Sequence, residues 1–438
     1  MIFKQILKNK SFLVYGLGLT GQSVIKFLKE TKAKKISLWD DDINLRKKFN
    51  LNKNISIKKK ISEADFIILS PGVSLRKSNQ KKLLKKNENK IITDIDLFFL
   101  TNKIFKSIVV TGTNGKSTTC SIIKKVLSDA GYNTVVVGNI GKPILNYKLG
   151  NKSNVVIVIE MSSFQLEYSK FVRPNHAILI NITKDHLDWH GSVKNYINAK
   201  FKIFSLQNRK DYAYLPQQNN IIKLFNIKNM KSNIIINKKK VQNLIKKNIS
   251  NTYLMTKSNL ENLSFIYYLK NNFKISNKSF FYSLKNFKGL EHRQEIFFKK
   301  NNVYFINDSK ATTFAATEGC LMNFKNIIWI VGGLKKIGDQ FNINKIKKNI
   351  LKVFIIGKNR SFFKNKINKK INYLETINIQ KTIKNIFIEL KNFRKNQNKD
   401  KIFVILSPAS ASYDQFKNFE ERGKIFKKLI TFNAKKYL

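Results

Sequence analysis

The sequence predicts an α/β protein made of three successive units, each with a mainly parallel sheet. Short apolar runs rich in Val and Ile alternate with longer amphipathic runs along the chain, which is the order expected of strands and covering helices in such sheets. Glycine, serine or acidic residues follow most apolar runs, and ligands bind at the carboxyl ends of parallel strands. We expect a Rossmann-like unit at residues 1–106, a central phosphate-loop unit at 107–288 and a second Rossmann-like unit at 289–438.

The composition fits several folded domains and weighs against a nucleic-acid-binding protein. The chain has 438 residues, 42% of them hydrophobic, and a formal net charge of +56. Lysine is spread over nearly the whole chain and arginine is rare, whereas nucleic-acid-binding faces use Arg for bidentate contacts. We therefore expect no nucleic-acid partner, although a basic nucleic-acid-binding NTPase stays open as a rival function.

The cysteines and apolar segments indicate a cytoplasmic protein. Cys120 and Cys320 are the only cysteines, so no disulfide framework is available. The first 21 residues have lysines and an apolar run like a signal peptide but lack a small-residue cleavage site. No apolar stretch approaches the roughly 20 residues that cross a bilayer. We expect no membrane insertion and a monomer.

The first unit carries a glycine turn between a strand and a helix. Gly16, Gly18 and Gly21 form G-x-G-x-x-G, and Asp40 follows the next strand. This pattern is typical of dinucleotide sites, but its physics requires only a diphosphate at a helix N-terminus. A nicotinamide cofactor, a nucleotide-sugar diphosphate and a turn without a ligand remain open at this point.

The segment VVTGTNGKSTT, residues 109–119, predicts an ATP site of an unusual class. Its first glycine, Gly112, is two residues closer to the Gly-Lys-Ser that begins at Gly115 than the first glycine is in the widespread phosphate loop. Backbone N–H groups can still face phosphate oxygens, Lys116 can reach the β- and γ-phosphates, and a following hydroxyl can hold Mg²⁺. Glu160 ends the strand VVIVIE as a magnesium-binding acid would, although for this residue alone a polar strand end without a ligand is the plainer interpretation. The loop residues are Gly112, Thr113, Asn114, Gly115, Lys116, Ser117 and Thr118.

A polar cluster in the central unit allows two interpretations. Asp185, His186, Asp188 and His190 lie within NITKDHLDWHG. They form either a metal-ligand cluster or a solvated loop, and their spacing favours the loop. Lys200 follows in a helix-like segment, where a solvated position is the plainer interpretation. The Lys/Asn-rich stretch from residue 207 to 257 has only broken strand patterns.

The third unit shows four apolar strands, each ending in Asp, Gly or Ser. They lie in VYFINDSKATT, NIIWIVGG, KVFIIGKN and KIFVILSPASAS. No long Pro/Gly linker separates the three units, so we expect domains that meet at a small-molecule cleft.

The motifs together resemble the ATP-dependent Mur ligases, which build the peptide of bacterial cell-wall precursors. The resemblance rests on TGTNGKSTT, GNIG, EMSSFQLE, NITKDHLD and NAK in that order. YGLGLTG, SPGV, NDSKATT and SPASASYDQFKNFEERG are similar to the D-glutamate-adding members of the family. The short phosphate loop is the normal form in this family, and the nicotinamide interpretation becomes secondary.

The resemblance implies roles for the central unit. Lys116 and Ser117 would hold ATP and a first Mg²⁺, with Glu160 as a further ligand; His186 and Lys200 would serve a second Mg²⁺. Lys200 matches a lysine that the family carbamylates, and Lys116, His186 and Lys200 would be the catalytic residues. Further ATP-binding residues would be Asn259, Asn262, Arg293, Asp308 and Lys310, with His292 beside them.

The resemblance also implies the substrates, UDP-N-acetylmuramoyl-L-alanine and D-glutamate. The UDP-sugar would contact Gly18, Leu19, Thr20, Asp40, Ser70, Pro71, Gly72 and Asn139. D-glutamate would contact Thr312, Lys336, Ser412 and Phe419. The sequence departs from the family pattern at Asp41 and Asp42, where some relatives carry Thr-Arg, at Lys335, where an acid is frequent, and at Tyr413, where a leucine is known.

The implied reaction is an ATP-dependent amide ligation through an acyl phosphate. Rival functions are another Mur-type ligase, the related folate polyglutamate ligase, a nicotinamide-dependent dehydrogenase and the basic NTPase. The folate enzyme lacks an N-terminal nucleotide-sugar unit, and the meso-diaminopimelate-adding enzyme would carry an Asn-Pro-Arg signature that is absent from this sequence.

Overall fold

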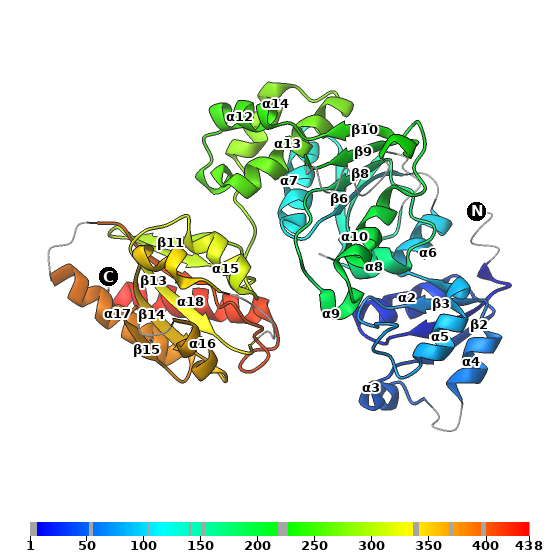
Figure 1. Cartoon of the computed structure of the whole chain (residues 1–438), viewed down its shortest axis with the longest axis horizontal. Helices are drawn as coiled ribbons and strands as arrows, with labels where there is room; N and C mark the ends of the chain where they lie inside the picture. Colours follow the sequence, from blue (N-terminus) through cyan, green and yellow to red (C-terminus); the bar gives the residue numbers. More distant parts are fainter. Residues whose placement is uncertain are drawn as a thin grey trace. The chain divides into compact units, whose positions relative to one another are not determined.

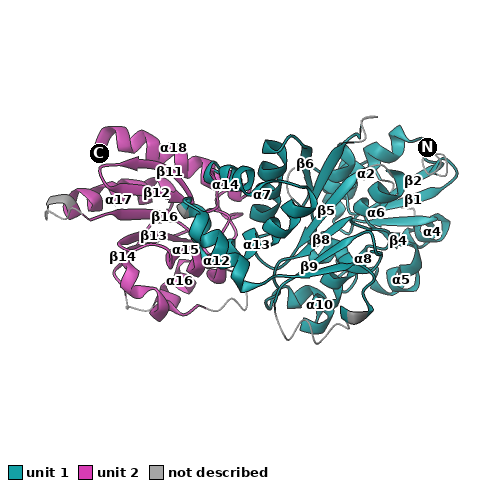
Figure 2. Ribbon diagram, turned by 90° about the horizontal axis from the view of Figure 1, so that it is seen from above, with its two compact units in different colours: residues 1–287 teal, residues 288–438 magenta. Residues whose placement is uncertain are grey.

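The computed structural model contains three α/β sheets in two compact units, which confirms the predicted fold class. Residues 1–287 form unit 1 and residues 288–438 form unit 2 (Figure 2). Two sheets belong to unit 1 and one to unit 2. The structure describes residues 7–51, 56–102, 105–139, 142–149, 154–217, 227–335, 341–367, 371–395 and 400–437.

The first sheet has the strand order β2-β1-β3-β4 and is parallel throughout (Figure 1). Its strands β1 and β3 are almost fully buried, which explains their continuous apolar runs. The very short β4 is the strand that the sequence patterns did not indicate. The elements are β1 (Ser11–Tyr15), α2 (Leu19–Glu30), β2 (Lys35–Trp39), α3 (Ile43–Lys48), α4 (Ile57–Glu63), β3 (Phe66–Leu69), α5 (Lys81–Lys86), η1 (Glu88–Lys90), β4 (Ile91–Ile92) and α6 (Asp94–Thr101).

The second sheet has the order β10-β9-β8-β5-β7-β6 and is also parallel. The strand before the phosphate loop, β5, lies between β8 and β7, so three carboxyl ends meet beside that loop. The described part of the Lys/Asn-rich stretch contains β9, β10 and α12. The elements are β5 (Lys106–Thr111), α7 (Lys116–Asp129), β6 (Asn133–Gly138), η2 (Ile144–Asn146), β7 (Val155–Glu160), α8 (Ser163–Tyr168), β8 (His176–Leu179), α9 (Leu187–His190), α10 (Val193–Phe201), η3 (Lys202–Phe204), β9 (Tyr212–Leu215), η4 (Ile227–Asn229), β10 (Asn233–Ile236), α12 (Lys239–Asn248), η5 (Thr252–Met255), α13 (Lys257–Asn272) and α14 (Asn277–Lys285).

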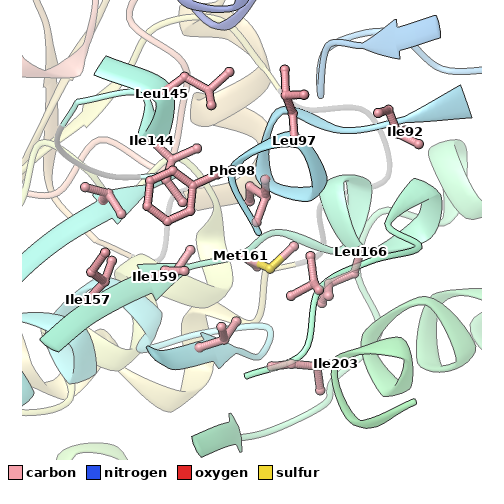
Figure 3. Close-up of a cluster of buried hydrophobic side chains, with 14 of the residues drawn as sticks. Ile92, Leu97, Phe98, Ile144, Leu145, Ile157, Ile159, Met161, Leu166 and Ile203 are labelled. Atoms are coloured by element: carbon pink, nitrogen blue, oxygen red, sulfur yellow. The ribbon is translucent and has the colours of Figure 1, made fainter. Parts of the chain in front are cut away.

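A shared hydrophobic core joins the first two sheets into unit 1. Figure 3 shows Leu97 and Phe98 of α6 packed with Ile157 and Ile159 of β7 and with Leu166 of α8. All five side chains are at most 1% exposed. Apolar burial of this kind stabilises a fold in proportion to the area removed from water. The first and second sheets therefore share one hydrophobic core, although each has its own strand order.

Unit 2 contains a six-stranded sheet of order β11-β12-β16-β13-β14-β15. It is parallel except for the edge strand β11, which runs antiparallel to β12. The four predicted strands are present, and the two edge strands are additional. The elements are β11 (Glu295–Lys300), β12 (Val303–Asn307), α15 (Phe314–Leu321), β13 (Ile327–Gly332), η6 (Ile343–Lys345), η7 (Lys347–Asn349), β14 (Ile350–Ile356), α16 (Arg360–Ile367), β15 (Tyr373–Glu375), α17 (Ile379–Lys395), β16 (Ile402–Leu406) and α18 (Phe419–Tyr437).

None of the helices in the described part of the chain is both long and apolar enough to cross a bilayer.

Candidate active site

The phosphate loop connects β5 to α7 and requires its two glycines for space. A Cβ on Gly112 would lie 2.3 Å from Ile180 Cγ1, and a Cβ on Gly115 would lie 2.4 Å from Asn262 Nδ2. Gly115 also has a φ of +86° at the N-cap of α7, a conformation that glycine adopts without strain. The loop is thus closely packed, and its shortened glycine spacing corresponds to a defined backbone shape.

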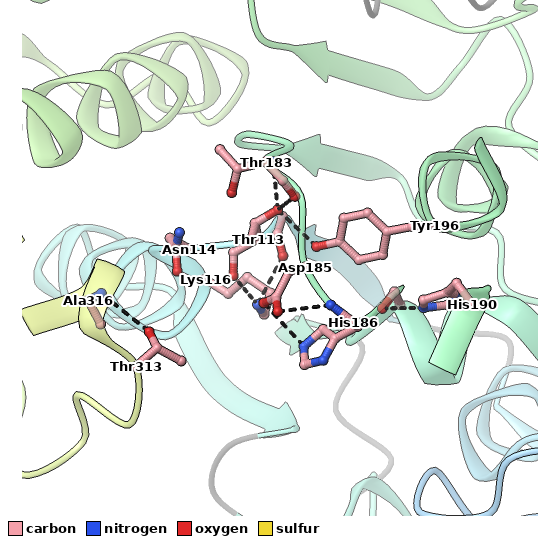
Figure 4. Close-up of polar contacts among 12 residues, drawn as sticks. Thr113, Asn114, Lys116, Thr183, Asp185, His186, His190, Tyr196, Thr313 and Ala316 are labelled. Atoms are coloured by element: carbon pink, nitrogen blue, oxygen red, sulfur yellow. Dashed lines mark hydrogen bonds and ion pairs between the residues drawn. The ribbon is translucent and has the colours of Figure 1, made fainter. Parts of the chain in front are cut away.

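Residues that follow β8 hold the loop in this shape. Asn181 accepts hydrogen bonds from the main-chain N–H groups of Thr113 (3.1 Å) and Asn114 (3.0 Å), and its amide donates to the Asn114 carbonyl (3.0 Å). The Thr113 hydroxyl lies 2.8 Å from the Tyr196 hydroxyl and accepts from Thr183 N–H (Figure 4). The sequence prediction missed Asn181 and Tyr196; the only signal was their place in the polar motif after the strand.

Two lysines converge on one carbonyl of the loop. Lys116 Nζ donates to the Gly112 carbonyl (2.9 Å) and to the Thr113 carbonyl (2.9 Å), and Lys200 Nζ donates to the same Gly112 carbonyl (2.8 Å). Lys200 is only 1% exposed, so the solvated interpretation of this residue is wrong. Burial lowers the pKa of Lys200 well below its usual value, and the nearby Lys116 charge lowers it further. A polyphosphate is the type of ligand that would relieve this concentration of positive charge.

Glu160 provides a buried carboxylate at the end of β7. It is 2% exposed, and its Oε1 accepts from Asn139 Nδ2 at 3.1 Å. Its buried Oε2 has no hydrogen-bond partner among the described residues. A buried unpartnered carboxylate oxygen is costly, and a divalent cation is a ligand that satisfies it. The residues present therefore fit a Mg²⁺ ion, with Ser117 at the first turn of α7 as a hydroxyl donor.

The polar cluster of residues 185–190 is not a metal cluster in itself. His190 is fully buried, with Nε2 2.9 Å from Ser163 Oγ, while Asp188 pairs with Lys77 at 3.0 Å. His186 lies beside Asp185, with Nε2 3.4 Å from its carboxylate (Figure 4). Within the described ranges, no group of three or more His, Cys, Asp or Glu side chains is arranged to hold a metal ion.

The two asparagines of α13 differ in environment. Asn262 is 1% exposed and packs against Gly115 of the phosphate loop. On sequence grounds a solvated helix position is equally possible for this residue, and its burial excludes that interpretation. Its buried Nδ2 lacks a hydrogen-bond partner in the described part of the chain. Asn259 lies near the start of the helix and donates to the Tyr253 carbonyl at 2.9 Å. Only Asn262 thus reaches the loop directly.

The expected UDP-sugar residues gather at the carboxyl edge of the first sheet. Asp40 accepts from Leu17 N–H at 2.7 Å, and Ser70 Oγ donates to the Gly16 carbonyl at 2.8 Å. A Cβ on Gly18 would meet nothing within 4 Å, in contrast to Gly16 and Gly21. This open position is the one that a ligand could approach. Leu19 is 81% exposed, Thr20 and Pro71 are half-buried, and Gly72 is exposed.

In unit 2, Asp308 lies at the end of β12 within a network of buried polar groups. Its carboxylate accepts from Ser407 Oγ (2.7 Å) and from Gln294 N–H (3.1 Å). Burial raises the pKa of Asp308 to about 6. Asn307 Nδ2 lies 2.8 Å from His292 Nδ1, and the nearby Arg293 charge partly offsets the rise in the pKa of Asp308.

Among the other candidates of unit 2, Lys310 contacts the first residue of α18. Lys310 Nζ lies 4.7 Å from the centre of the Phe419 ring, and Ser412 is 2% exposed. Thr312 is half-buried. Tyr413 is 72% exposed. Lys336 lies outside the described residues.

The sequence prediction also missed Arg422, which is 1% exposed. Its guanidinium donates to Ser309 Oγ (2.9 Å), the Ser309 carbonyl (2.8 Å) and the Ser410 carbonyl (3.0 Å). It joins the loop that carries Asp308 to the loop that carries Ser412. Arg422 lies in the first turn of α18, and its only sequence signal is its place in the motif SPASASYDQFKNFEERG.

Two family models match the chain in the regions described above. The Mur ligase middle domain matches residues 110–279, and the Mur ligase MurD-like N-terminal domain matches residues 10–92. A UDP-N-acetylmuramoylalanine–D-glutamate ligase of Rickettsia bellii is 34% identical over 448 residues, which cover 96% of this chain and 97% of the relative. The chain belongs to the Mur ligase family. Membership implies the use of ATP, and the glycine turn of residues 16–21 is part of a Mur ligase N-terminal domain, which removes the dehydrogenase alternative.

Other Mur ligases share the fold at lower identity. A ligase of the same name from Francisella tularensis strain FSC 198 is 32% identical over 97% of this chain and 96% of its own. The solved MurF ligase of Thermotoga maritima, in complex with ADP, matches with a TM-score of 0.58 at 14% identity over 98% of this chain and 97% of its own. The MurC ligase of the same organism matches with a TM-score of 0.56 at 15% identity over 98% and 100%.

Proposed function

We propose that this Mur ligase joins D-glutamate to UDP-N-acetylmuramoyl-L-alanine with the hydrolysis of ATP, a step in peptidoglycan precursor synthesis. The observation that carries the ATP-dependent chemistry is the convergence of Lys116 and Lys200 on the Gly112 carbonyl, beside the unpartnered oxygen of Glu160. The choice of substrates is supported by relatives named UDP-N-acetylmuramoylalanine–D-glutamate ligase, which are 31–34% identical over at least 96% of the chain.

The reaction has two steps. The carboxylate of the L-alanyl group attacks the γ-phosphorus of ATP, so a C–O–P bond forms, the bond to the β-phosphate oxygen breaks, and ADP leaves. The amine of D-glutamate then attacks the carbonyl carbon of the acyl phosphate. The C–N bond forms, the C–O bond to phosphate breaks, inorganic phosphate leaves, and the amine proton goes to solvent.

Lys116 would stabilise the transferring phosphoryl group. It stands at the first position of α7, and its ammonium is already directed at the loop carbonyls. Binding of a triphosphate would redirect this charge to the phosphate oxygens, where it stabilises the charge of the transition state. Gly112 to Thr118 would surround the phosphates, with Asn262 against the loop and Asn259 nearer the nucleoside.

Mg²⁺ would be held by Ser117 and Glu160, and a second ion by His186 and a modified Lys200. Bound Mg²⁺ supplies positive charge that neutralises the phosphate oxygens. Asn139, which donates to Glu160 Oε1, would orient this carboxylate while contacting substrate. The orphaned Glu160 oxygen is the observation that supports this assignment.

We propose that Lys200 is carbamylated by CO₂. Only an unprotonated amine attacks CO₂, and burial lowers the pKa of Lys200 in the direction that favours the amine. The N–C bond forms as the amine loses a proton, and the product is a carbamate anion. An ammonium at this position would repel both metal ions. The carbamate would instead attract them, and it would also attract the Lys116 ammonium.

The remaining assignments follow the motif positions. Arg293, Asp308 and Lys310 would contact ATP from unit 2, and Thr312, Lys336, Ser412 and Phe419 would hold D-glutamate. In unit 1, the UDP-sugar would lie along Gly18, Leu19, Thr20, Asp40, Ser70, Pro71 and Gly72. We further propose that the protein acts as a cytoplasmic monomer without a nucleic-acid partner.

The decisive experiment is a phosphate-release assay with ATP, Mg²⁺ and UDP-N-acetylmuramoyl-L-alanine. We expect release that depends on D-glutamate and a product heavier by one glutamyl residue. Release that does not depend on D-glutamate would reject this assignment.

A further inference from the structure

The loop after β3, residues 70–80, is tied to the glycine turn at its start, to the Tyr168 hydroxyl at Leu75 N–H (3.3 Å) and to the segment after β2 near its end. At its start, Ser70 Oγ donates to the Gly16 carbonyl at 2.8 Å. Near its end, Ser78 Oγ donates to Asp41 Oδ2 at 2.9 Å and lies 2.9 Å from the Tyr15 hydroxyl. Between these points are Pro71 and Gly72, which we assign to the UDP-sugar. These contacts therefore limit how far this wall of the substrate site can move.

Asp41 is the centre of the contact near the end of this loop. Its Oδ1 accepts from the Tyr15 hydroxyl at 2.6 Å and from Trp39 Nε1 at 3.3 Å. Tyr15, at the end of β1, is fully buried, and both burial and Asp41 raise the pKa of its phenol, so the hydroxyl remains a donor at neutral pH. One half-buried carboxylate thus joins the ends of β1 and β2 to the loop after β3.

The neighbouring Asp40 holds the glycine turn, which we also assign to the UDP-sugar. Its Oδ2 accepts from Leu17 N–H in the glycine turn, whereas Asp41 reaches across to Ser78. Two consecutive acids therefore fix the two segments expected to contact the UDP-sugar. The loop also carries the Lys77–Asp188 ion pair, but both side chains are more than half exposed, and such pairs contribute little. Hydrogen bonds to a partly buried carboxylate are stronger.

We propose that Asp41, with Tyr15 and Ser78, forms a positioning network that holds residues 70–80 and thereby sets the affinity for the UDP-sugar substrate. The inference rests on the proposed function in that it takes the carboxyl edge of the first sheet as the UDP-sugar site. It assigns Asp41 a role in shaping the site in place of direct contact with the ligand, since its oxygens already accept from three protein donors.

The test compares Asp41→Asn, Tyr15→Phe and Ser78→Ala with the wild type in steady-state kinetics. We expect the KM for UDP-N-acetylmuramoyl-L-alanine to rise about tenfold in each, while kcat and the KM for ATP and D-glutamate change less than about twofold. The hydroxyl-deleting variants remove only one group each, so they test the network even if Asp41→Asn folds poorly.

Matched controls exist in the same unit. Asp65→Asn removes a carboxylate that accepts from Ser11 N–H (2.7 Å) at the opposite end of β1, and Tyr132→Phe removes a hydroxyl that donates to the Phe273 carbonyl (2.9 Å). Both should leave the KM for the UDP-sugar unchanged. In the double variant Tyr15→Phe/Ser78→Ala, the fold-increase in the KM for the UDP-sugar should be smaller than the product of the increases in the two single variants. The reason is that the two hydroxyls share Asp41.

A direct binding measurement separates this inference from the proposed function. Calorimetric titration with UDP needs no turnover, and we expect its dissociation constant to rise about tenfold in the three variants. Weaker UDP binding in the variants of a protein that shows no D-glutamate-dependent reaction would retain the network and reject the ligase assignment. Unchanged UDP affinity and KM, an equal effect in the controls, or no UDP binding by the wild type would overturn the network.

Discussion

The phosphate loop of unit 1 and the candidate amino-acid site of unit 2 are organised differently. In unit 1, one loop receives contacts from Asn181, Tyr196, Asn262 and two lysines, and every contact lies within the same packed unit. In unit 2, Arg422 and Asp308 fix the candidate loops to each other. The difference indicates that contacts within unit 1 set the shape of the phosphate loop, while a separate network of buried polar groups holds the candidate loops of unit 2.

The largest expected effect is the loss of Lys116. Lys116→Ala removes the charge that we assign to the transferring phosphoryl group, so we expect D-glutamate-dependent phosphate release to fall by about a thousandfold. Lys125→Ala on the same helix, which breaks only a partly exposed ion pair with Asp129, should retain activity. Comparable losses in both variants would mean that the helix, rather than the Lys116 charge, determines the rate.

The loss of Lys200 tests whether the loop depends on a carbamate. Lys200→Ala should lose activity by about a hundredfold or more, and short-chain carboxylates such as formate or acetate should restore part of it by replacing the missing anion. The measurement is phosphate release with and without added carboxylate. Activity like that of the wild type in Lys200→Ala would reject the carbamate. Loss without rescue would leave Lys200 with the role of a cation on the Gly112 carbonyl.

A pH experiment examines the buried carboxyl group of unit 2. The folded pKa of Asp308 is about 6, raised above 3.8 by burial, so its contribution to stability is present below pH 4 and is lost as pH rises through 6. The difference of about two pKa units corresponds to about 3 kcal/mol. An asparagine side chain does not ionise, so the Asp308→Asn variant does not lose this contribution. Its free energy of unfolding minus that of the wild type should therefore rise by up to about 3 kcal/mol from pH 4 to pH 7, as measured by urea unfolding.

Asp94→Asn is the counterpart in unit 1. Burial raises the pKa of Asp94 to about 7. The free energy of unfolding of Asp94→Asn, relative to the wild type, should therefore keep rising to a higher pH than that of Asp308→Asn. A gain with no pH dependence in either variant would show that the carboxyl groups ionise normally in the folded protein.

The smallest expected effect concerns Tyr413. Its side chain is 72% exposed, so Tyr413→Leu, which introduces the residue expected from the resemblance, should change the KM for D-glutamate by less than about threefold. Steady-state kinetics at saturating ATP gives the value. A much larger change would place Tyr413 in contact with D-glutamate and would make the amino-acid site of unit 2 more dependent on its exposed residues than we infer.

Local sequence patterns predicted the parts of the site that lie directly after strands. Gly112 and Glu160 lie at the ends of neighbouring strands of the second sheet, and Asp308 follows a strand of the sheet in unit 2. In each of these sheets the carboxyl ends of the parallel strands meet at one edge. The patterns failed where contacts are between distant segments, as for Asn181 and Arg422. They also gave the plainer interpretation of Lys200 as solvated, because an isolated lysine in a helical segment carries no sign of burial.

The sequence by itself determined the α/β fold class, the position of the phosphate loop and the family. It did so because strand periodicity, glycine spacing and motif order are properties of neighbouring residues. Only the tertiary structure decided that β5 lies between β8 and β7, that two lysines share the Gly112 carbonyl, and that Asp41 holds Ser78. These features depend on strand order and on burial, which are set by packing among segments far apart in the chain.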